Sequence, residues 1–340
     1  FAEHFTALLA PLTNHPRVRH FRHRGMIWAV DIDTEDPDFR PRFDRAHEGV
    51  KRIARLMLPG IFGSSVAQVS LLLDTIIASF LMVGSVTWMY AADRLVEFPM
   101  GVFAIALATV ILPGLSSHHA AESREKFTAT LDWALRLTIT IVAPAAVGLL
   151  MLAGPLIATI FGYGAFSARD VLMCSYALMA YSMGLIGFSL VKVLAPGYFA
   201  RQDTKTPVKV GIIALSINMT FNVAVVVPAY LSGFPVPHAL LALSTGLSAL
   251  INATLLYRGL RRQGVYVPSD KWRRLLPQVV AASLAMAGFL WWISGDWALW
   301  AGWPVAQRVV WLAMAVGGGA AVYFAVLGLM GLRPRDLKSL

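Results

Sequence analysis

The chain has 340 residues, of which 57% are hydrophobic and 14% are charged, and its mean hydropathy is +0.63. An average soluble domain is roughly a quarter charged, so this composition excludes an ordinary soluble protein and indicates a polytopic membrane protein. The formal net charge of +10 does not indicate a nucleic-acid partner, because the basic residues cluster in alternate connections between apolar segments.

Residues 1–48 differ from the rest of the chain. They contain five of the eight histidines and many charges of both signs. Residues 5–12 predict a short amphipathic helix, while residues 17–32 alternate in polarity and break at Gly25, which predicts a two-stranded ribbon. Such a short α/β-like extension cannot bury enough surface to be stable alone. The spacing of the histidines fits no metal site, and solvated surface histidines are the simpler interpretation.

From residue 51 onwards, apolar segments of about 20 residues or more alternate with short charged clusters. To within a few residues, they predict eight membrane spans, at 52–83, 86–113, 127–158, 168–198, 206–229, 238–260, 272–294 and 306–331. Basic clusters, such as Arg124 with Lys126 and Arg201 with Lys205, fall in every second connection. The positive-inside rule makes that side cytoplasmic, so an even number of spans leaves both termini inside.

Three charged residues, Asp93, Arg94 and Glu97, stand together in the second predicted span. An isolated arginine at the bilayer centre costs from about 3 to more than 10 kcal/mol, so such residues normally face a cavity or the protein interior. Asp93 and Glu97 share a helix face, and Arg94 could bind phosphate through its guanidinium fork. The alternative is a self-neutralising ion-pair cluster that only fixes helix packing.

Asp74 and several uncharged polar residues are predicted at similar depth. Counted from the Gly84 turn, Arg94 lies about 14 Å deep and Asp74 about 15 Å deep on the preceding helix, so these two could form a salt bridge. Asn218 and Asn222 share a face of the fifth span, and Ser244 and Thr245 enter the sixth. Asp74, the two asparagines and a hydroxyl could together bind Na⁺. The alternative is interhelical hydrogen bonding without an ion, worth about 0.6 kcal/mol per bond.

Two further basic residues, Lys192 and Arg136, are secondary candidates for substrate binding. Both lie near the inner ends of apolar spans, where extension of the side chain to the membrane surface is the simpler interpretation. No phosphate-binding loop, nucleophile elbow or H-E-x-x-H motif occurs, which argues against an ATP-driven pump or a hydrolase. The single Cys174 excludes a disulfide framework. We therefore expect a transporter and not an enzyme.

Several runs of the sequence resemble the MurJ (MviN) family of lipid II flippases. One is Trp88-Met-Tyr-Ala-Ala-Asp-Arg-Leu-Val-Glu-Phe-Pro99, and the others are the runs at 55–68, 74–81, 191–197 and 201–208. The resemblance extends from about Lys51 to the C-terminus. It implies an all-α polytopic fold of the multidrug/oligosaccharidyl-lipid/polysaccharide (MOP) exporter superfamily, with a six-helix C-lobe at 49–263 and two additional helices at 264–340 that form a lipid-tail groove.

The resemblance also implies roles for the charged and polar residues. Arg94, Asp93 and Glu97 would line the cavity that receives the pyrophosphate and sugars of lipid II, and a sodium site would lie near Asp74, Asn218, Asn222 and Thr245. The family has fourteen helices, so the six-helix N-lobe is expected to be missing. Because alternating access needs two lobes, the chain is expected to be inactive alone unless a separately encoded N-lobe complements it. Membrane lipids are the other expected partners.

Other interpretations remain open at this point. Another exporter of lipid-linked oligosaccharides and a structural membrane subunit without transport are the alternatives. Residues 1 to about 43 resemble a C-terminal fragment of a diaminopelargonate-type aminotransferase, in sequence runs such as His15-Pro-Arg-Val-Arg-His-Phe-Arg22. Those enzymes bind pyridoxal phosphate through a lysine, but the first lysine here is Lys51. A fused or misassembled reading frame without aminotransferase activity is therefore expected. No cofactor other than a possible Na⁺ is expected.

Overall fold

A computed structural model of the chain describes residues 18–24, 27–32, 65, 68–295, 300 and 302–332. The chain divides into two compact units, Phe1–Ala54 and Arg55–Leu340. The assignment of residues 1–48, 49–263 and 264–340 to separate domains stays a prediction.

The first unit contains an antiparallel hairpin. Strand β1 (Val18–Arg24) pairs with strand β2 (Ile27–Ile32), with Phe21 opposite Val30 and Arg24 opposite Ile27. The predicted two-stranded ribbon is therefore confirmed, and its strands flank the predicted break at Gly25. The predicted helix at residues 5–12 lies outside the described residues.

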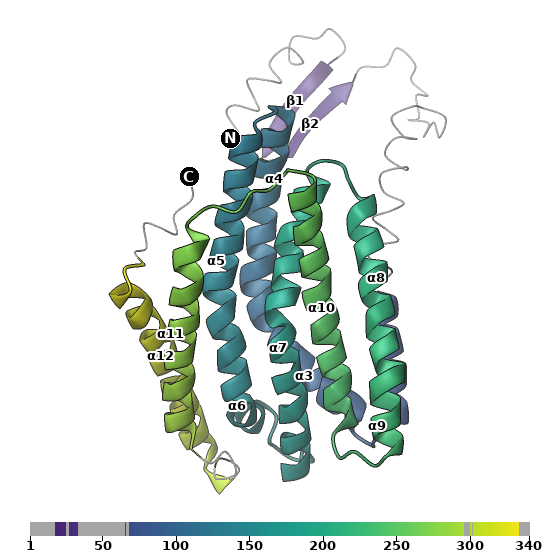
Figure 1. The fold of residues 1–340 in the computed structure, drawn as a ribbon, viewed down its shortest axis with the longest axis vertical. Coiled ribbons are helices and arrows are strands. Elements are labelled where there is room, and N and C mark those ends of the chain that lie inside the picture. The colour runs from purple at the N-terminus through teal and green to yellow at the C-terminus, as the bar shows by residue number, and fades with distance from the viewer. Residues whose placement is uncertain are drawn as a thin grey trace. The chain divides into compact units, whose positions relative to one another are not determined.

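The second unit is a bundle of long apolar helices (Figure 1). Within the described residues, seven helices are long and apolar enough to cross a membrane, and they match the second to eighth predicted spans. The first span is represented by the shorter helix Gln68–Phe80. The other elements are α3 (Ser85–Pro99), η1 (Met100–Ile105), α4 (Ala106–Ala120), α5 (Arg124–Met151), α6 (Ala153–Ile160), α7 (Ala168–Phe199), α8 (Lys205–Phe221), η2 (Asn222–Val226), α9 (Val227–Leu231), α10 (Pro237–Arg262), α11 (Trp272–Ser294) and α12 (Val305–Leu329).

Local sequence sets the ends of these helices. Gly84 has a φ of 98°, a left-handed conformation that glycine adopts without strain, and it ends the turn between helix Gln68–Phe80 and α3. Ser167 and Asp170 form a reciprocal capping box at the start of α7. Short connections keep successive helices antiparallel. The α4–α5, α7–α8 and α10–α11 connections therefore lie at the same end of the bundle, the upper end in Figure 1.

Helix α7 is the centre of the bundle. It packs against α3, α5 and α10, and its residues contribute to the two largest apolar clusters of the unit. Helices α11 and α12 pack against each other, and they join the bundle through α5 and α6. Large apolar side chains such as Leu284, Trp292 and Val310 are exposed on this pair, as expected for helices that face lipid.

Two π-helical segments interrupt the α-helical hydrogen bonding. Segment η1 begins at Met100, directly after Pro99, a residue that disrupts α-helical hydrogen bonding, and the chain continues into α4 without a break. Segment η2 begins at Asn222. Such segments occur frequently at functional sites, and both segments here lie next to polar residues of the candidate site.

Candidate substrate and ion site

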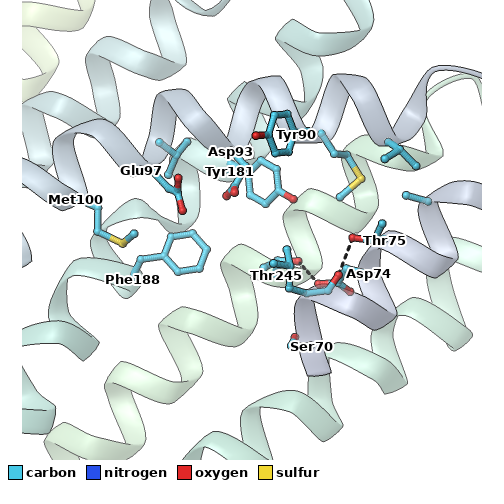
Figure 2. A pocket seen from close by; sticks show the side chains of 15 residues that line it. Ser70, Asp74, Thr75, Tyr90, Asp93, Glu97, Met100, Tyr181, Phe188 and Thr245 are labelled. Carbon is cyan, nitrogen blue, oxygen red and sulfur yellow. Dashed lines mark hydrogen bonds between the residues drawn. The ribbon is translucent and has the colours of Figure 1, made fainter. Parts of the chain in front are cut away.

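A cavity of about 280 Å³ lies among helix Gln68–Phe80, α3, α7 and α10 (Figure 2). Its polar lining includes three carboxylates, Asp74, Asp93 and Glu97. Tyr90 and Tyr181 add phenol groups, and Tyr181 projects into the space between Asp93 and Asp74 (Figure 2). The structure therefore places Asp93 and Glu97, predicted for the substrate site, around the same cavity as Asp74, predicted for the sodium site, and the described part of the cavity wall is acidic.

Arg94 lies beside this cavity and does not line it. Its Nη1 donates to Glu97 Oε2 at 2.6 Å, and its guanidinium carbon lies 4.7 Å from the centroid of the Tyr90 ring. The Arg94 side chain is 51% exposed. One residue along a helix is a rotation of about 100°, so the turn that aims Asp93 into the cavity aims Arg94 to its edge. The predicted salt bridge between Arg94 and Asp74 is not formed.

Asp74 instead belongs to a hydrogen-bonded cluster. Asn222 Nδ2 donates to Asp74 Oδ1 at 3.0 Å, and Thr245 Oγ1 donates to Asp74 Oδ2 at 3.1 Å. Asn222 Nδ2 also donates to Asn218 Oδ1 at 2.9 Å, and Ser244 Oγ donates to Asn222 Oδ1. The structure thus joins all four residues predicted for a sodium site, from three separate helical segments, and adds Ser244.

The chemistry of this cluster suits a small hard cation. It offers one carboxylate, two amide oxygens and two hydroxyls, the oxygen ligands that such ions prefer. Asp74 is only 5% exposed, and no cationic side chain of the described residues lies within ion-pair distance of it. A buried carboxylate without a counter-charge is costly, so a bound cation would stabilise it. The amide of Asn222 now directs Nδ2 at Asp74, and rotating it would supply Oδ1 instead.

The two secondary candidates have different surroundings. Lys192 is exposed on α7, four residues after the cavity-lining Phe188 and on the same helix face. For Arg136, the expected extension of the side chain to the membrane surface is wrong. It is 8% exposed, and its Nε donates to Asp132 Oδ2 at 2.9 Å. Its buried ion partner, one helical turn earlier on α5, removes the need to reach solvent.

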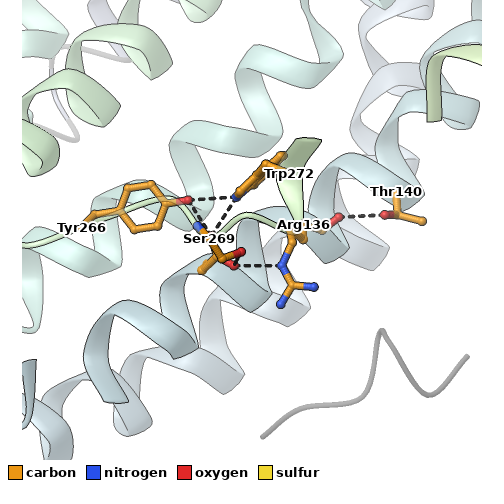
Figure 3. A network of polar contacts seen from close by, with 6 residues as sticks. Arg136, Thr140, Tyr266, Ser269 and Trp272 are labelled. Atoms are coloured by element: carbon orange, nitrogen blue, oxygen red, sulfur yellow. Dashed lines mark hydrogen bonds and ion pairs between the residues drawn. The ribbon is translucent and has the colours of Figure 1, made fainter. Parts of the chain in front are cut away.

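Figure 3 shows a polar network around Arg136, Tyr266, Ser269 and Trp272 that the sequence did not predict. Its centre is the carboxylate of Asp132. Besides Arg136, it accepts hydrogen bonds from Tyr266 Oη at 2.8 Å, Ser269 Oγ at 2.7 Å and Trp272 Nε1 at 2.7 Å. Burial and the Asp132 carboxylate raise the pKa of Tyr266, so this phenol stays a donor. The available signal was the Asp132–Arg136 spacing of four residues within an apolar span.

Comparisons with known proteins agree with this architecture. A family model described as lipid II flippase MurJ matches residues 8–310. A probable lipid II flippase MurJ of Vibrio cholerae is 44% identical over 300 residues, which cover 88% of this chain and 56% of that protein. The lipid II flippase MurJ of Burkholderia cenocepacia is 43% identical, covering 84% and 54%. The chain therefore spans about half the length of the curated relatives it matches.

Solved structures show the same fold. A lipid II flippase MurJ in an inward closed conformation matches with a TM-score of 0.61 and 23% identity, covering 83% of this chain and 57% of that one. An outward-facing MATE transporter of the MOP superfamily matches with a TM-score of 0.53 and 16% identity, covering 82% and 64%. The predicted exporter-superfamily fold is thereby confirmed.

The aminotransferase interpretation of residues 1–43 is not borne out. The flippase family model begins at residue 8 and so includes most of that segment. The resemblance rested on about 40 residues of short runs, and runs of that length recur in unrelated proteins.

Proposed function

Because the chain belongs to the MurJ family of lipid II flippases, we propose that it forms part of a transporter that carries lipid II across the inner membrane. Lipid II is the undecaprenyl-pyrophosphate-linked precursor of peptidoglycan, and its movement requires no bond to be made or broken. The chain would therefore be a transporter in cell-wall biogenesis and not an enzyme. Both termini would lie on the cytoplasmic side, as the distribution of basic residues suggests.

The observation that carries this proposal is the polar cavity inside an apolar helical bundle. Charged groups within a membrane protein normally mark a substrate or ion pathway. The cavity volume of about 280 Å³ is at the small end of ligand sites, so this wall would hold only part of a disaccharide-pentapeptide headgroup. A second lobe, in the same protein or separately encoded, would supply the opposite wall.

Arg94 is the residue that we propose for contact with the pyrophosphate. Its Glu97 bond uses one of five N–H donors, and its exposure at the cavity edge leaves the guanidinium accessible. Asp93 and Glu97, which share the cavity face, would orient Arg94 and release it after transport. Lys192 would offer a second cationic contact further along the same face of α7.

This role can be tested with Arg94→Gln in the protein that carries this chain. The substitution keeps a hydrogen-bonding side chain but removes the charge, and we expect transport to fall by roughly tenfold or more, the effect of losing one charge-assisted contact. The measurement is exposure of lipid II at the outer face of cells depleted of their own flippase. Arg169→Gln, an exposed arginine on α7 outside the cavity, is the matched control. Equal transport by both variants would remove Arg94 from the site.

We further propose that the Asp74 cluster binds the ion that drives transport, with Na⁺ as the first candidate. Asp74 would balance its charge, and Asn218, Asn222 and Thr245 would complete an oxygen shell. The cluster joins helix Gln68–Phe80 to η2 and α10, so occupancy would fix these elements relative to one another. The alternative, a purely structural hydrogen-bond network, predicts no response to Na⁺.

Thermal unfolding in detergent separates these two interpretations. With NaCl in place of choline chloride at equal ionic strength, we expect the melting temperature of the unmodified protein to rise, because a ligand that binds only the folded state stabilises it. Asp74→Asn should abolish the rise, whereas Asp270→Asn, at an exposed residue of the α10–α11 connection, should retain it. A rise that persists in Asp74→Asn would contradict the site.

A further inference from the structure

A second pocket, separate from the transport cavity, lies at the end of the bundle where the basic connections gather. Its volume is about 400 Å³. Its charged and polar lining comes from three connections and includes His118, His119, Glu122, Arg124, Arg201 and Gln263. The described lining residues include two arginines and two histidines but only one carboxylate, so the pocket favours an anion.

Both arginines are held in position and retain free donors. Arg124 Nη2 donates to the carbonyl oxygen of Gly264 at 3.0 Å, and Arg201 Nη1 donates to Gln263 Oε1 at 2.6 Å. Each guanidinium has five N–H groups. Within the described part of the chain, neither arginine lies within ion-pair distance of a carboxylate. Two oriented but unneutralised guanidinium groups therefore face the same space.

Helix-end caps shape the backbone around the pocket. Glu122 and Gln202, with φ of 53° and 59°, are the two non-glycine residues of the described segments in the left-handed region. They end α4 and α7 as Schellman-type caps, in which the Ser123 N–H donates to the carbonyl oxygen of His118 and the Asp203 N–H to that of Tyr198. Gly264 has a φ of 66°, a left-handed conformation that glycine adopts without strain, and its carbonyl oxygen accepts the hydrogen bond from Arg124 Nη2.

We propose that this pocket binds a phosphate group at the inner surface of the membrane. Two arginines converging on one space match the geometry of phosphate oxygens. The apolar part of α5 begins at the buried Phe127, which lines the same pocket, so the pocket lies at headgroup level. The phosphate of an anionic phospholipid fits this position, and free phosphate shares its chemistry.

A bound phosphate would link three connections that are far apart in sequence. Arg124 starts α5, Arg201 follows α7, and Gln263 follows α10. The pocket is distinct from the lipid II cavity, because it shares none of that cavity's lining residues. The inference therefore stands independently of the proposed transport function.

The test uses the full chain in detergent, with phosphatidylglycerol, phosphatidylcholine or inorganic pyrophosphate as probes and native mass spectrometry as the readout. We expect phosphatidylglycerol to bind and phosphatidylcholine to bind at least about tenfold more weakly. Gln263→Glu should weaken phosphatidylglycerol binding at least about tenfold, because a carboxylate at the position of Oε1 would neutralise Arg201. Binding of pyrophosphate with the same sensitivity would assign the site to soluble phosphate.

Gln202→Glu is the matched control, because it makes the same charge change at an exposed neighbour that does not line the pocket. It should bind like the unmodified chain. Equal weakening in both variants would indicate diffuse surface charge, and no weakening in Gln263→Glu would equally overturn the proposal. The test can be repeated by removing positive charge. The double variant Arg124→Gln/Arg201→Gln is then compared with Arg273→Gln/Arg274→Gln, which removes two arginines at the same end of the bundle.

Discussion

A buried carboxylate, Asp132, holds the start of the α11–α12 pair against the bundle. Its partners Tyr266, Ser269 and Trp272 lie in or next to the α10–α11 connection, more than 130 residues further along the chain. With Arg136 they satisfy both carboxylate oxygens. A fully satisfied buried network fixes one arrangement of its members, and a partly satisfied one is costly.

Asp132→Asn should therefore destabilise the protein strongly. The new amide would present N–H groups to donors that now point at a carboxylate, and Arg136 would keep its buried charge without a partner. We expect a loss of about 3 kcal/mol or more, the usual cost of breaking a buried ion pair from one side. Thermal unfolding in detergent measures it. Asp270→Asn, in the same connection but exposed, should unfold like the unmodified protein, and a similar result for Asp132→Asn would contradict the role of the network.

Sequence reasoning identified residues on one helix well and contacts between helices less well. Depth and helical spacing correctly brought Asp74, Asn218, Asn222 and Thr245 together, because helices of similar length run side by side across a membrane. Depth carries no information about rotation about the helix axis, so it could not separate Asp93, inside the cavity, from Arg94, at its edge. Asp132 was missed because its partners come from a connection whose path is fixed only by tertiary packing.

At the contact between α7 and α10, glycines allow the two helix backbones to approach closely. Gly184 of α7 lies against Gly246 of α10, and Gly187 lies against the backbone of Ala249 and Leu250. Small residues at such crossings let backbones approach closely, which favours van der Waals packing where no hydrophobic effect drives association. This contact places Tyr181 of α7 and Thr245 of α10 in the wall of the same cavity.

Gly184→Ala should separate the two helices. A Cβ atom there would overlap the Cα atom of Gly246, and backbone cannot move aside as a flexible side chain does. We expect a loss of about 1–3 kcal/mol of stability, measured by thermal unfolding. Gly288→Ala on α11, where a Cβ atom meets nothing within 4 Å, is the control and should be neutral or gain up to about 1 kcal/mol. Equal behaviour of both variants would show that the crossing tolerates a methyl group.

For the second unit as a whole, the α11–α12 pair is attached to the bundle at three levels. Besides the Asp132 network, Tyr323 Oη donates to the carbonyl oxygen of Thr140 at 2.8 Å, and Arg308 Nη1 donates to that of Ala158 at 3.0 Å. The acceptors lie along α5 and α6. Since little of α12 is buried within the bundle, these polar contacts supply an orientation that apolar packing alone cannot. We expect the pair to move together with α5 as one body.

The orientation of the second unit in the membrane can be tested by cysteine labelling. Most arginines and lysines near the helix ends lie in or next to the α4–α5, α7–α8 and α10–α11 connections, at one end of the bundle, and the positive-inside rule predicts that this end is cytoplasmic. In a Cys174→Ser background, single cysteines can be introduced at two exposed positions, Glu125→Cys at the basic end and Ser232→Cys at the opposite end. In right-side-out membrane vesicles, a membrane-impermeant maleimide should label Ser232→Cys directly, whereas Glu125→Cys should react only after detergent is added. The reverse pattern would invert the topology, and it would also move the phosphate pocket to the outer surface.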